Sequence, residues 1–217
     1  MNKDLVAYYA SRAAEYEHLY SRPDRQSDLA RMSALLQDVF WKKNALEIAC
    51  GTGYWTQRLA LTAASVLATD INEAMLHIAR AKVYPPGRVE FRCDDIFRSA
   101  VDQQFDGVFG GFIWSHILLE RLDDFIARMR MRIHPGGVLV LADNRYVAGS
   151  STPIAETDPA GNTYQRRSLQ DGSEHLVLKN FPAPAFLTDK LTAQGFEVAW
   201  QELDYYWLAI GKLSTAP

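Results

Sequence analysis

The chain has 217 residues, of which 48% are hydrophobic and 23% charged, a balance typical of an ordinary globular protein with a sizeable core. Its net charge of −3 provides no basic field that would attract DNA or RNA, so we expect no nucleic-acid partner. No apolar stretch approaches the length of a membrane span and the first residues carry no export signal, so we expect a cytoplasmic protein without membrane contact.

The predicted elements begin with a helical N-terminus, in which residues 29 to 40 carry an apolar stripe made of Leu29, Met32, Leu36, Val39 and Phe40. From Ala45 to Val147, short apolar strands then alternate with helical stretches. The strands are predicted at 45–49, 65–70, 89–93, 105–112 and 136–144, and the helices at 54–64, 72–83 and 118–133. This alternation predicts an α/β fold, with a mostly parallel sheet covered by helices on both faces.

The C-terminal third predicts two further units. Residues 150–181 are polar and contain the turn signal Asp171-Gly172, which predicts a hairpin laid over the sheet. A helix over 185–194 and two runs, 196–203 and 205–213, that pair antiparallel would close the chain. We predict one domain over 1–217, made of a helical lid (1–43), a cofactor-binding core (44–148), a substrate-covering hairpin (149–182) and a closing unit (183–217).

The two cysteines indicate neither a disulfide nor a metal site. Cys50 and Cys93 fall in segments expected to be buried strands, and reduced thiols are the simpler interpretation. Neither belongs to a CxxC pair, so we expect no bound metal.

The strongest motif is the run Leu46 to Gly53, in which glycines directly follow a strand and precede a helix. Glycine lets the backbone turn tightly and approach a ligand, and the helix presents free N–H groups. Asp70 closes the next strand 19 positions after Gly51, where a carboxylate would accept hydrogen bonds from ribose hydroxyls. The pattern fits a dinucleotide or S-adenosylmethionine (SAM). Thr56 stands where a dinucleotide fingerprint needs a third glycine, and Glu47 suits a cationic sulfonium better than a pyrophosphate.

Five motifs carry a family resemblance. ALEIACGTGYWT, ATDIN, VEFRCDDIF, FDGVFGGF and HPGG resemble, in order and spacing, the successive motifs of class I SAM-dependent methyltransferases over Ala45 to Ala142. Within that family, YYxxRAxEYE, the histidine of WSHI, RRSLQDG and FLTDKLTAQGF resemble the phosphonate O-methyltransferase of the dehydrophos pathway. The resemblance implies a Rossmann-like seven-stranded sheet with an antiparallel last strand. It also implies SAM as cofactor, S-adenosylhomocysteine (SAH) as product and a small-molecule acceptor.

The resemblance also implies a set of cofactor-binding residues. Asp70 would hold the ribose, Ile71 and Met75 would pack on the adenine, and either Asp94 or Asp95 would read the adenine amino group. The full set is Tyr9, Arg12, Tyr16, Ala49, Gly51, Gly53, Trp55, Asp70, Ile71, Met75, Asp94, Asp95, Ile96 and Phe112.

Helical spacing puts Tyr9, Arg12 and Tyr16 on one helix face. This face either packs its aromatics on the core or forms a lid whose arginine pairs with the SAM carboxylate.

Three residues are candidates for the acceptor site. His116 follows the fourth strand at its carboxyl end, where it is either structural or a general base for a hydroxyl acceptor. Arg166 and Arg167 lie in the predicted hairpin. Strand alternation allows one of them to face the cleft and grip an anion, unless both are simply solvated.

The segment GGFIWSH occupies the place where enzymes methylating nucleobases or glutamine amides carry [DN]PP[YF]. We therefore expect an oxygen acceptor, which is a hydroxyl, a carboxylate or a phosphonate. Two alternatives stay open at this point: a nicotinamide-dependent oxidoreductase, and a non-catalytic SAM-binding protein. No pattern indicates an oligomeric state.

Overall fold

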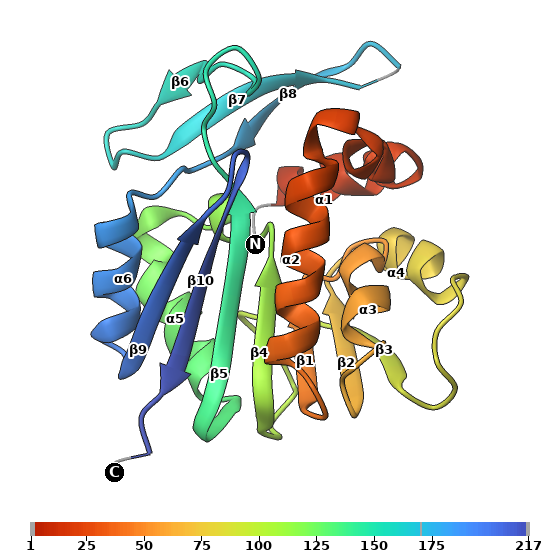
Figure 1. Ribbon diagram of the computed structural model, residues 1–217. Helices are drawn as coiled ribbons and strands as arrows, with labels where there is room; N and C mark the ends of the chain where they lie inside the picture. Colours follow the sequence, from red (N-terminus) through yellow and green to blue (C-terminus); the bar gives the residue numbers. More distant parts are fainter. Residues whose placement is uncertain (1–2, 170, 216–217) are drawn as a thin grey trace.

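A computed structural model describes residues 3–169 and 171–215, and its centre is a seven-stranded sheet of order β3-β2-β1-β4-β5-β10-β9 (Figure 1). The strands are β1 (Asn44–Ile48), β2 (Ser65–Asp70), β3 (Val89–Cys93), β4 (Phe105–Gly111), β5 (Ile133–Asn144), β9 (Phe196–Glu202) and β10 (Tyr206–Leu213). β1 to β5 pair in parallel, and β10 runs antiparallel to both β5 and β9. The expected Rossmann-like sheet with an antiparallel last strand is confirmed.

Helices cover both faces of this sheet (Figure 1). On one face, α2 (Gln26–Val39), α3 (Tyr54–Leu59) and α4 (Glu73–Arg80) bury Leu36, Leu59 and Leu76 in one apolar cluster. On the other, α5 (Leu122–Arg130) and α6 (Pro184–Thr192) bury Phe125 and Leu187 in a second cluster. Burying each such side chain contributes about 1.5–3 kcal/mol, so the two clusters fix the sheet and the loops at its ends.

Two segments lie across the carboxyl ends of the parallel strands (Figure 1). The first is the N-terminal segment (residues 3–25), made of α1 (Lys3–Arg12) and the 3-10 helices η1 (Ala13–Ser21) and η2 (Pro23–Arg25). The second is the insertion sheet, made of β6 (Glu156–Thr157), β7 (Thr163–Ser168) and β8 (Glu174–Leu178). Two more 3-10 turns, η3 (Trp114–His116) and η4 (Leu119–Arg121), follow β4. Within the described residues, no helix is both long and apolar enough to span a bilayer.

The structure corrects several expectations about single elements. The helix predicted over 54–64 ends at Leu59 and closes with a turn in which Ala63 N–H donates to Leu59 O at 2.9 Å. Ala64 N–H then donates to Lys43 O, in the loop before β1, at 2.9 Å. The α-helix expected to reach Tyr16 ends at Arg12 and continues as a 3-10 helix. The hairpin β7–β8 has β6 as a third strand. Cys93 is exposed rather than buried, because β3 is an edge strand.

Candidate active site

A cavity with an empty volume of about 750 Å³, open solvent included, lies at the carboxyl ends of β1, β2 and β4. It gathers residues from five separate segments of the chain. Twelve residues singled out in the sequence line it: Tyr9, Tyr16, Ala49, Gly51, Asp70, Ile71, Met75, Asp94, Asp95, Ile96, Phe112 and His116. We call it the first cavity.

The turn after β1 and the end of β2 shape the floor of the first cavity. Gly51 has a positive φ of 57°, a conformation that favours glycine. Its N–H donates to Asp70 Oδ2 at 2.8 Å, and Asn72 N–H donates to Asp70 Oδ1 at 2.8 Å. Burial raises the pKa of Asp70 above its ordinary value, and these backbone donors oppose the rise. The carboxylate is therefore held rigidly, and each oxygen keeps a lone pair for a ligand.

Two residues of the same motif do not line the cavity. A Cβ at Gly53 would collide with the Tyr84 hydroxyl and lie 3.1 Å from Ala79 Cβ, so this glycine is required for packing against the segment that follows α4. Trp55 is buried and stacks on Phe112, with ring centroids 6.1 Å apart and an interplanar angle of 16°. Trp55 supports a cavity-lining ring rather than lining the cavity itself.

The segment after β3 brings two neighbouring carboxylates to the rim of the first cavity. Asp95 Oδ1 accepts from Phe97 N–H at 3.0 Å, and Asp94 Oδ1 accepts from Ala100 N–H at 3.3 Å. Ile96, which follows them in sequence, is buried and offers an apolar surface. Both aspartates thus remain candidates for reading a ligand's amino group.

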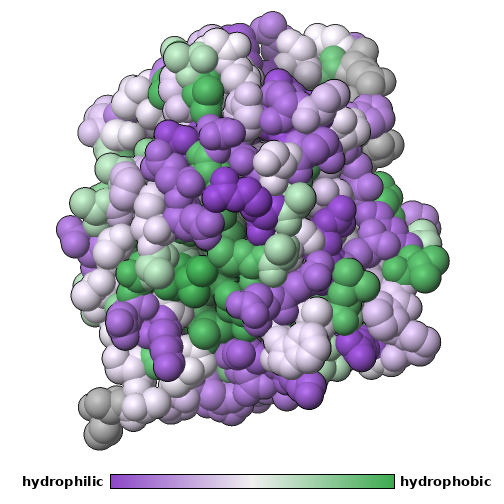
Figure 2. Space-filling view, viewed as in Figure 1, coloured by the Kyte–Doolittle hydropathy of each residue, from purple (hydrophilic) through white to green (hydrophobic). Residues whose placement is uncertain are grey.

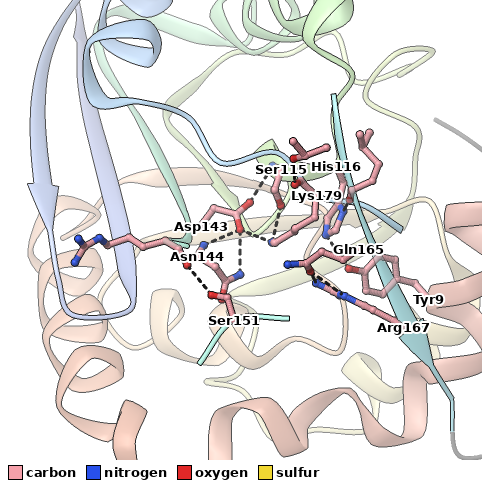
Figure 3. Close-up of polar contacts among 12 residues, drawn as sticks. Tyr9, Ser115, His116, Asp143, Asn144, Ser151, Gln165, Arg167 and Lys179 are labelled. Atoms are coloured by element: carbon pink, nitrogen blue, oxygen red, sulfur yellow. Dashed lines mark hydrogen bonds and ion pairs between the residues drawn. The ribbon is translucent and has the colours of Figure 1, made fainter. Parts of the chain in front are cut away.

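His116 lies where the first cavity meets a second one, and its hydrogen bonds define its protonation (Figure 3). Nδ1 lies 2.7 Å from Leu178 O, a carbonyl that can only accept, so Nδ1 carries the proton. Nε2 lies 2.7 Å from the Tyr9 hydroxyl, which donates to it. Burial, reinforced by the nearby Lys179 ammonium, holds the pKa of His116 well below its ordinary value. The imidazole is therefore neutral near pH 7.

A buried ion pair lies behind His116, and sequence reasoning missed it (Figure 3). Lys179 Nζ donates to Asp143 Oδ1 at 2.7 Å and to Ser115 Oγ at 2.6 Å. Ser115 N–H and Asn144 N–H also donate to the Asp143 carboxylate, at 3.0 and 2.7 Å. Asp143 ends β5 beside β4, so its place at the carboxyl edge could have been found from the strand pattern. Nothing local in the sequence singles out Lys179.

The second cavity lies between the N-terminal segment and the insertion sheet, and has an empty volume of about 1270 Å³. Tyr9, Tyr16, Phe112 and His116 line both cavities and so form their junction. Its basic lining residues are Arg12, Arg22, Arg25, Arg145, Arg166, Arg167 and Lys179. No aspartate or glutamate is found in this lining among the residues that the structure describes.

The positive charges of these basic side chains are neutralised by nearby carboxylates to different extents. The outer ones have carboxylate partners beyond the lining: Arg22 and Arg25 with Asp24, Arg145 with Glu202, and Arg166 with Glu156 and Glu174. Arg12 and Arg167 form no ion pair with a described carboxylate. Arg12 Nη1 instead donates to the Tyr8 hydroxyl at 3.2 Å, and Arg167 Nη2 donates to Gln165 Oε1 at 2.6 Å.

The structure shows where the arginines singled out in the sequence lie relative to the two cavities. Arg12 lines the second cavity and not the first. Of the hairpin pair, the Arg166 side chain is 55% exposed, whereas Arg167 is half-buried and lies close to Tyr9 (Figure 3). Both line the second cavity, but alternation along β7 directs them to opposite faces of the strand, so Arg167 lies toward Tyr9 and Arg166 is the more exposed of the two.

Comparison with known proteins shows which chemistry this architecture serves. Residues 45–137 match a family described as Methyltransferase domain. The chain is 30% identical, with a TM-score of 0.78, to a solved structure described as DhpI-SAH complex structure, over 99% of this chain and 97% of that one. A second, described as DhpI-SAM-HEP complex, is 28% identical with a TM-score of 0.80, over 98% and 99% of the two chains. The chain is also 23% identical to a demethylmenaquinone methyltransferase of Tropheryma whipplei, over 99% of this chain and 97% of the relative.

The chain belongs to the class I SAM-dependent methyltransferases. It is a SAM-dependent enzyme acting on small molecules, and the alternatives of an oxidoreductase and of a non-catalytic SAM-binding protein are set aside.

The residues of the first cavity fit SAM. A Cβ on Gly51 would stand 3.9 Å from Tyr16, in the space between the glycine turn and the N-terminal segment. The fixed Asp70 carboxylate offers acceptors for ribose hydroxyls, and the apolar side chains of Ile71, Met75 and Ile96 offer a surface for an adenine ring.

Proposed function

We propose that this methyltransferase transfers its methyl group to an oxygen of a small anionic molecule, a carboxylate or a phosphonate. The observation that carries the proposal is the second cavity, which has seven basic lining residues and no described acidic one, in a chain of net charge −3. Four of the seven have carboxylate partners beyond the lining and Lys179 is paired with Asp143, so Arg12 and Arg167 carry the positive charge that would favour an anion. The oxygen-methylating enzymes that the sequence resembles support the same acceptor.

In this proposal the cofactor lies in the first cavity and the acceptor in the second, and they meet at Tyr9, Tyr16, Phe112 and His116. Bound SAM supplies an electrophilic methyl group on a sulfonium. Arg167 would hold the acceptor anion, aided by Arg12 from the N-terminal segment, so that one anionic oxygen faces the junction. Their contribution is alignment, since an ionised oxygen needs no base before it is methylated.

The state of His116 supports an anionic acceptor over an alcohol. An efficient general base has a pKa near the working pH, whereas burial and Lys179 depress the pKa of His116. Its Nε2 lone pair is also engaged by Tyr9. We infer that His116 fixes the Tyr9 hydroxyl at the junction, and that Tyr9 stays a phenol because burial raises its pKa.

The proposal is tested with acceptors that carry a choice of oxygens. Purified enzyme and SAM are incubated with a hydroxyalkyl phosphonate, the matching hydroxyalkyl carboxylate and the matching neutral alcohol, and the products are analysed by mass spectrometry and NMR. We expect methyl esters of the anionic group and no product from the alcohol. Asp70→Ala, which should lose SAH binding in calorimetry, serves as the control for enzyme-dependent transfer. A methyl ether on the hydroxyl group would overturn the proposal and make His116 a base.

A further inference from the structure

Glu17, on the 3-10 helix η1, reaches across to the turn that shapes the first cavity. Its Oε1 accepts from Thr52 Oγ1 at 2.7 Å and from Lys82 Nζ. Thr52 stands between Gly51 and Gly53 and is 1% exposed, so its hydroxyl has a fixed position. Lys82 follows the end of α4, the helix that contributes Met75 to the same cavity. One carboxylate thus joins the N-terminal segment to two elements of the cofactor site.

The 3-10 geometry of η1 places Glu17 on the same side of the helix as a second residue that contacts the core. In a 3-10 helix, side chains three residues apart eclipse one another, so Glu17 and Tyr20 lie on the same side. The Tyr20 ring stacks on Tyr54, the first residue of α3, with centroids 3.7 Å apart and an interplanar angle of 9°. Both side chains therefore contact the stretch Thr52–Tyr54, directly beyond Gly51.

A third tie holds the other end of the segment. Asn72 Nδ2 donates to Val6 O on α1 at 3.0 Å. Asn72 follows Asp70 and Ile71, caps α4 and lines the first cavity. Each of these three ties between the N-terminal segment and the core thus ends on a loop or helix that also builds the cofactor cavity.

The same segment completes the acceptor site. It contributes Tyr8, Tyr9, Arg12, Tyr16, Leu19, Tyr20, Arg22 and Arg25 to the second cavity. Without these residues, the cavity would lack the wall that faces the insertion sheet. Whatever fixes the segment against the core therefore determines whether an acceptor site exists.

We propose that Glu17 is a positioning residue that couples cofactor binding to formation of the acceptor site. A ligand resting on the Gly51 turn stabilises the position of Thr52, and through Glu17 it favours the closed N-terminal segment. By linkage, the closed segment must raise the affinity for that ligand to a corresponding degree, and we expect most of this gain as slower release. SAM then binds before the acceptor, and SAH leaves after the segment opens. This coupling does not depend on which atom of the acceptor is methylated, so it can fail while the proposed function stands.

The alternative is that Glu17 and Lys82 form a partly exposed ion pair that has no influence on the site. The Glu17 side chain is 40% exposed, and ion pairs of this kind usually contribute little. The two interpretations differ in a measurable way. A surface pair leaves SAH release and the protease sensitivity of the N-terminus unchanged, whereas a coupling residue alters both.

The experiment compares wild type with Glu17→Ala, Glu17→Gln and a matched control, His18→Ala, whose exposed side chain lies on the same 3-10 helix. The SAH dissociation rate is measured by stopped-flow competition, and trypsin cleavage of the N-terminal segment is followed with and without SAH. We expect Glu17→Ala to release SAH about 10-fold faster and to lose the protection that SAH gives. The acceptor KM should rise with little change in melting temperature without SAH. His18→Ala should behave as wild type.

Glu17→Gln separates the two partners of the carboxylate. It keeps an oxygen for Thr52 but loses the ion pair with Lys82, so it should lie between wild type and Glu17→Ala. A double-mutant cycle with Thr52→Val provides the second route. If Thr52 acts through Glu17, the double variant should be no worse than Glu17→Ala alone, because that variant has already lost the contact with Thr52. Unchanged SAH release and unchanged protection in Glu17→Ala, or full additivity in the cycle, would overturn the coupling.

Discussion

Replacing Arg167 by methionine should lower activity without lowering stability, and its neighbour provides the control. Arg167 forms no ion pair with a described carboxylate, and its charge raises the cost of charging Lys179 and His116 nearby. Removing this charge relieves repulsion within the folded protein. In the loaded enzyme, the same guanidinium would hold an acceptor anion, and a hydrogen bond to a charged group contributes about 1.5–3 kcal/mol.

That energy corresponds to a loss of about 10- to 100-fold in kcat/KM for an anionic acceptor, since about 1.4 kcal/mol is tenfold. Arg166→Met removes only contacts of 3.4 and 3.8 Å to exposed carboxylates, so kcat/KM should stay within about 2-fold of wild type. Steady-state kinetics and thermal unfolding of both variants check the prediction. Equal losses in the two variants, or a melting temperature that falls with activity in Arg167→Met, would refute the reasoning.

Two further predictions concern buried titratable groups. Burial raises the pKa of Glu47 from 4.5 to about 8, so between these values the folded state binds the extra proton and the free energy of unfolding should fall as pH rises, by at most about 1.4 kcal/mol per pH unit. Denaturant titrations should show this slope flattened in Glu47→Gln, and an unchanged slope would contradict the assignment. His116→Gln should reduce kcat for an anionic acceptor by less than about 10-fold, where loss of a general base would cost about 100-fold or more. With a carboxylate acceptor, which does not titrate near neutral pH, the wild-type pH–rate profile should then show no limb near pH 6.5, and such a limb would restore His116 as a base.

The residues that line the first cavity were largely predictable because their signals are local. The glycine after β1, the acidic residue that closes β2 and the pair after β3 each follow a strand directly, and parallel strands bring their carboxyl ends to one edge. Local spacing does not reveal the packing role of a residue. Gly53 and Trp55 share the motif with Gly51, yet their neighbours show that they pack beneath the cavity. The predicted division of the chain into lid, core, hairpin and closing unit stays a prediction.

The acceptor half depends on contacts that no local pattern encodes. Asp143 and Lys179 meet across 36 positions, and Thr52 and Glu17 across 35. Alternation in β7 predicted that one arginine of the pair would face inward, but the choice of Arg167 depends on the register with β8, where it lies opposite His175. A single sequence carries the alternation but not the register of a hairpin with a multi-residue loop.

The contrast between Lys179 and Arg167 explains how one small region can be both stable and receptive to an anion. A buried charge is costly unless it is paired, and Lys179 meets this requirement within the protein through Asp143 and Ser115. Its ammonium is thereby fixed, and its field acts on His116 to keep the imidazole neutral. Arg167 has a neutral amide as its hydrogen-bond acceptor, so its charge stays available for a ligand. Under the proposed function, the paired Lys179 sets the protonation of His116, and the unpaired charge of Arg167 selects the acceptor.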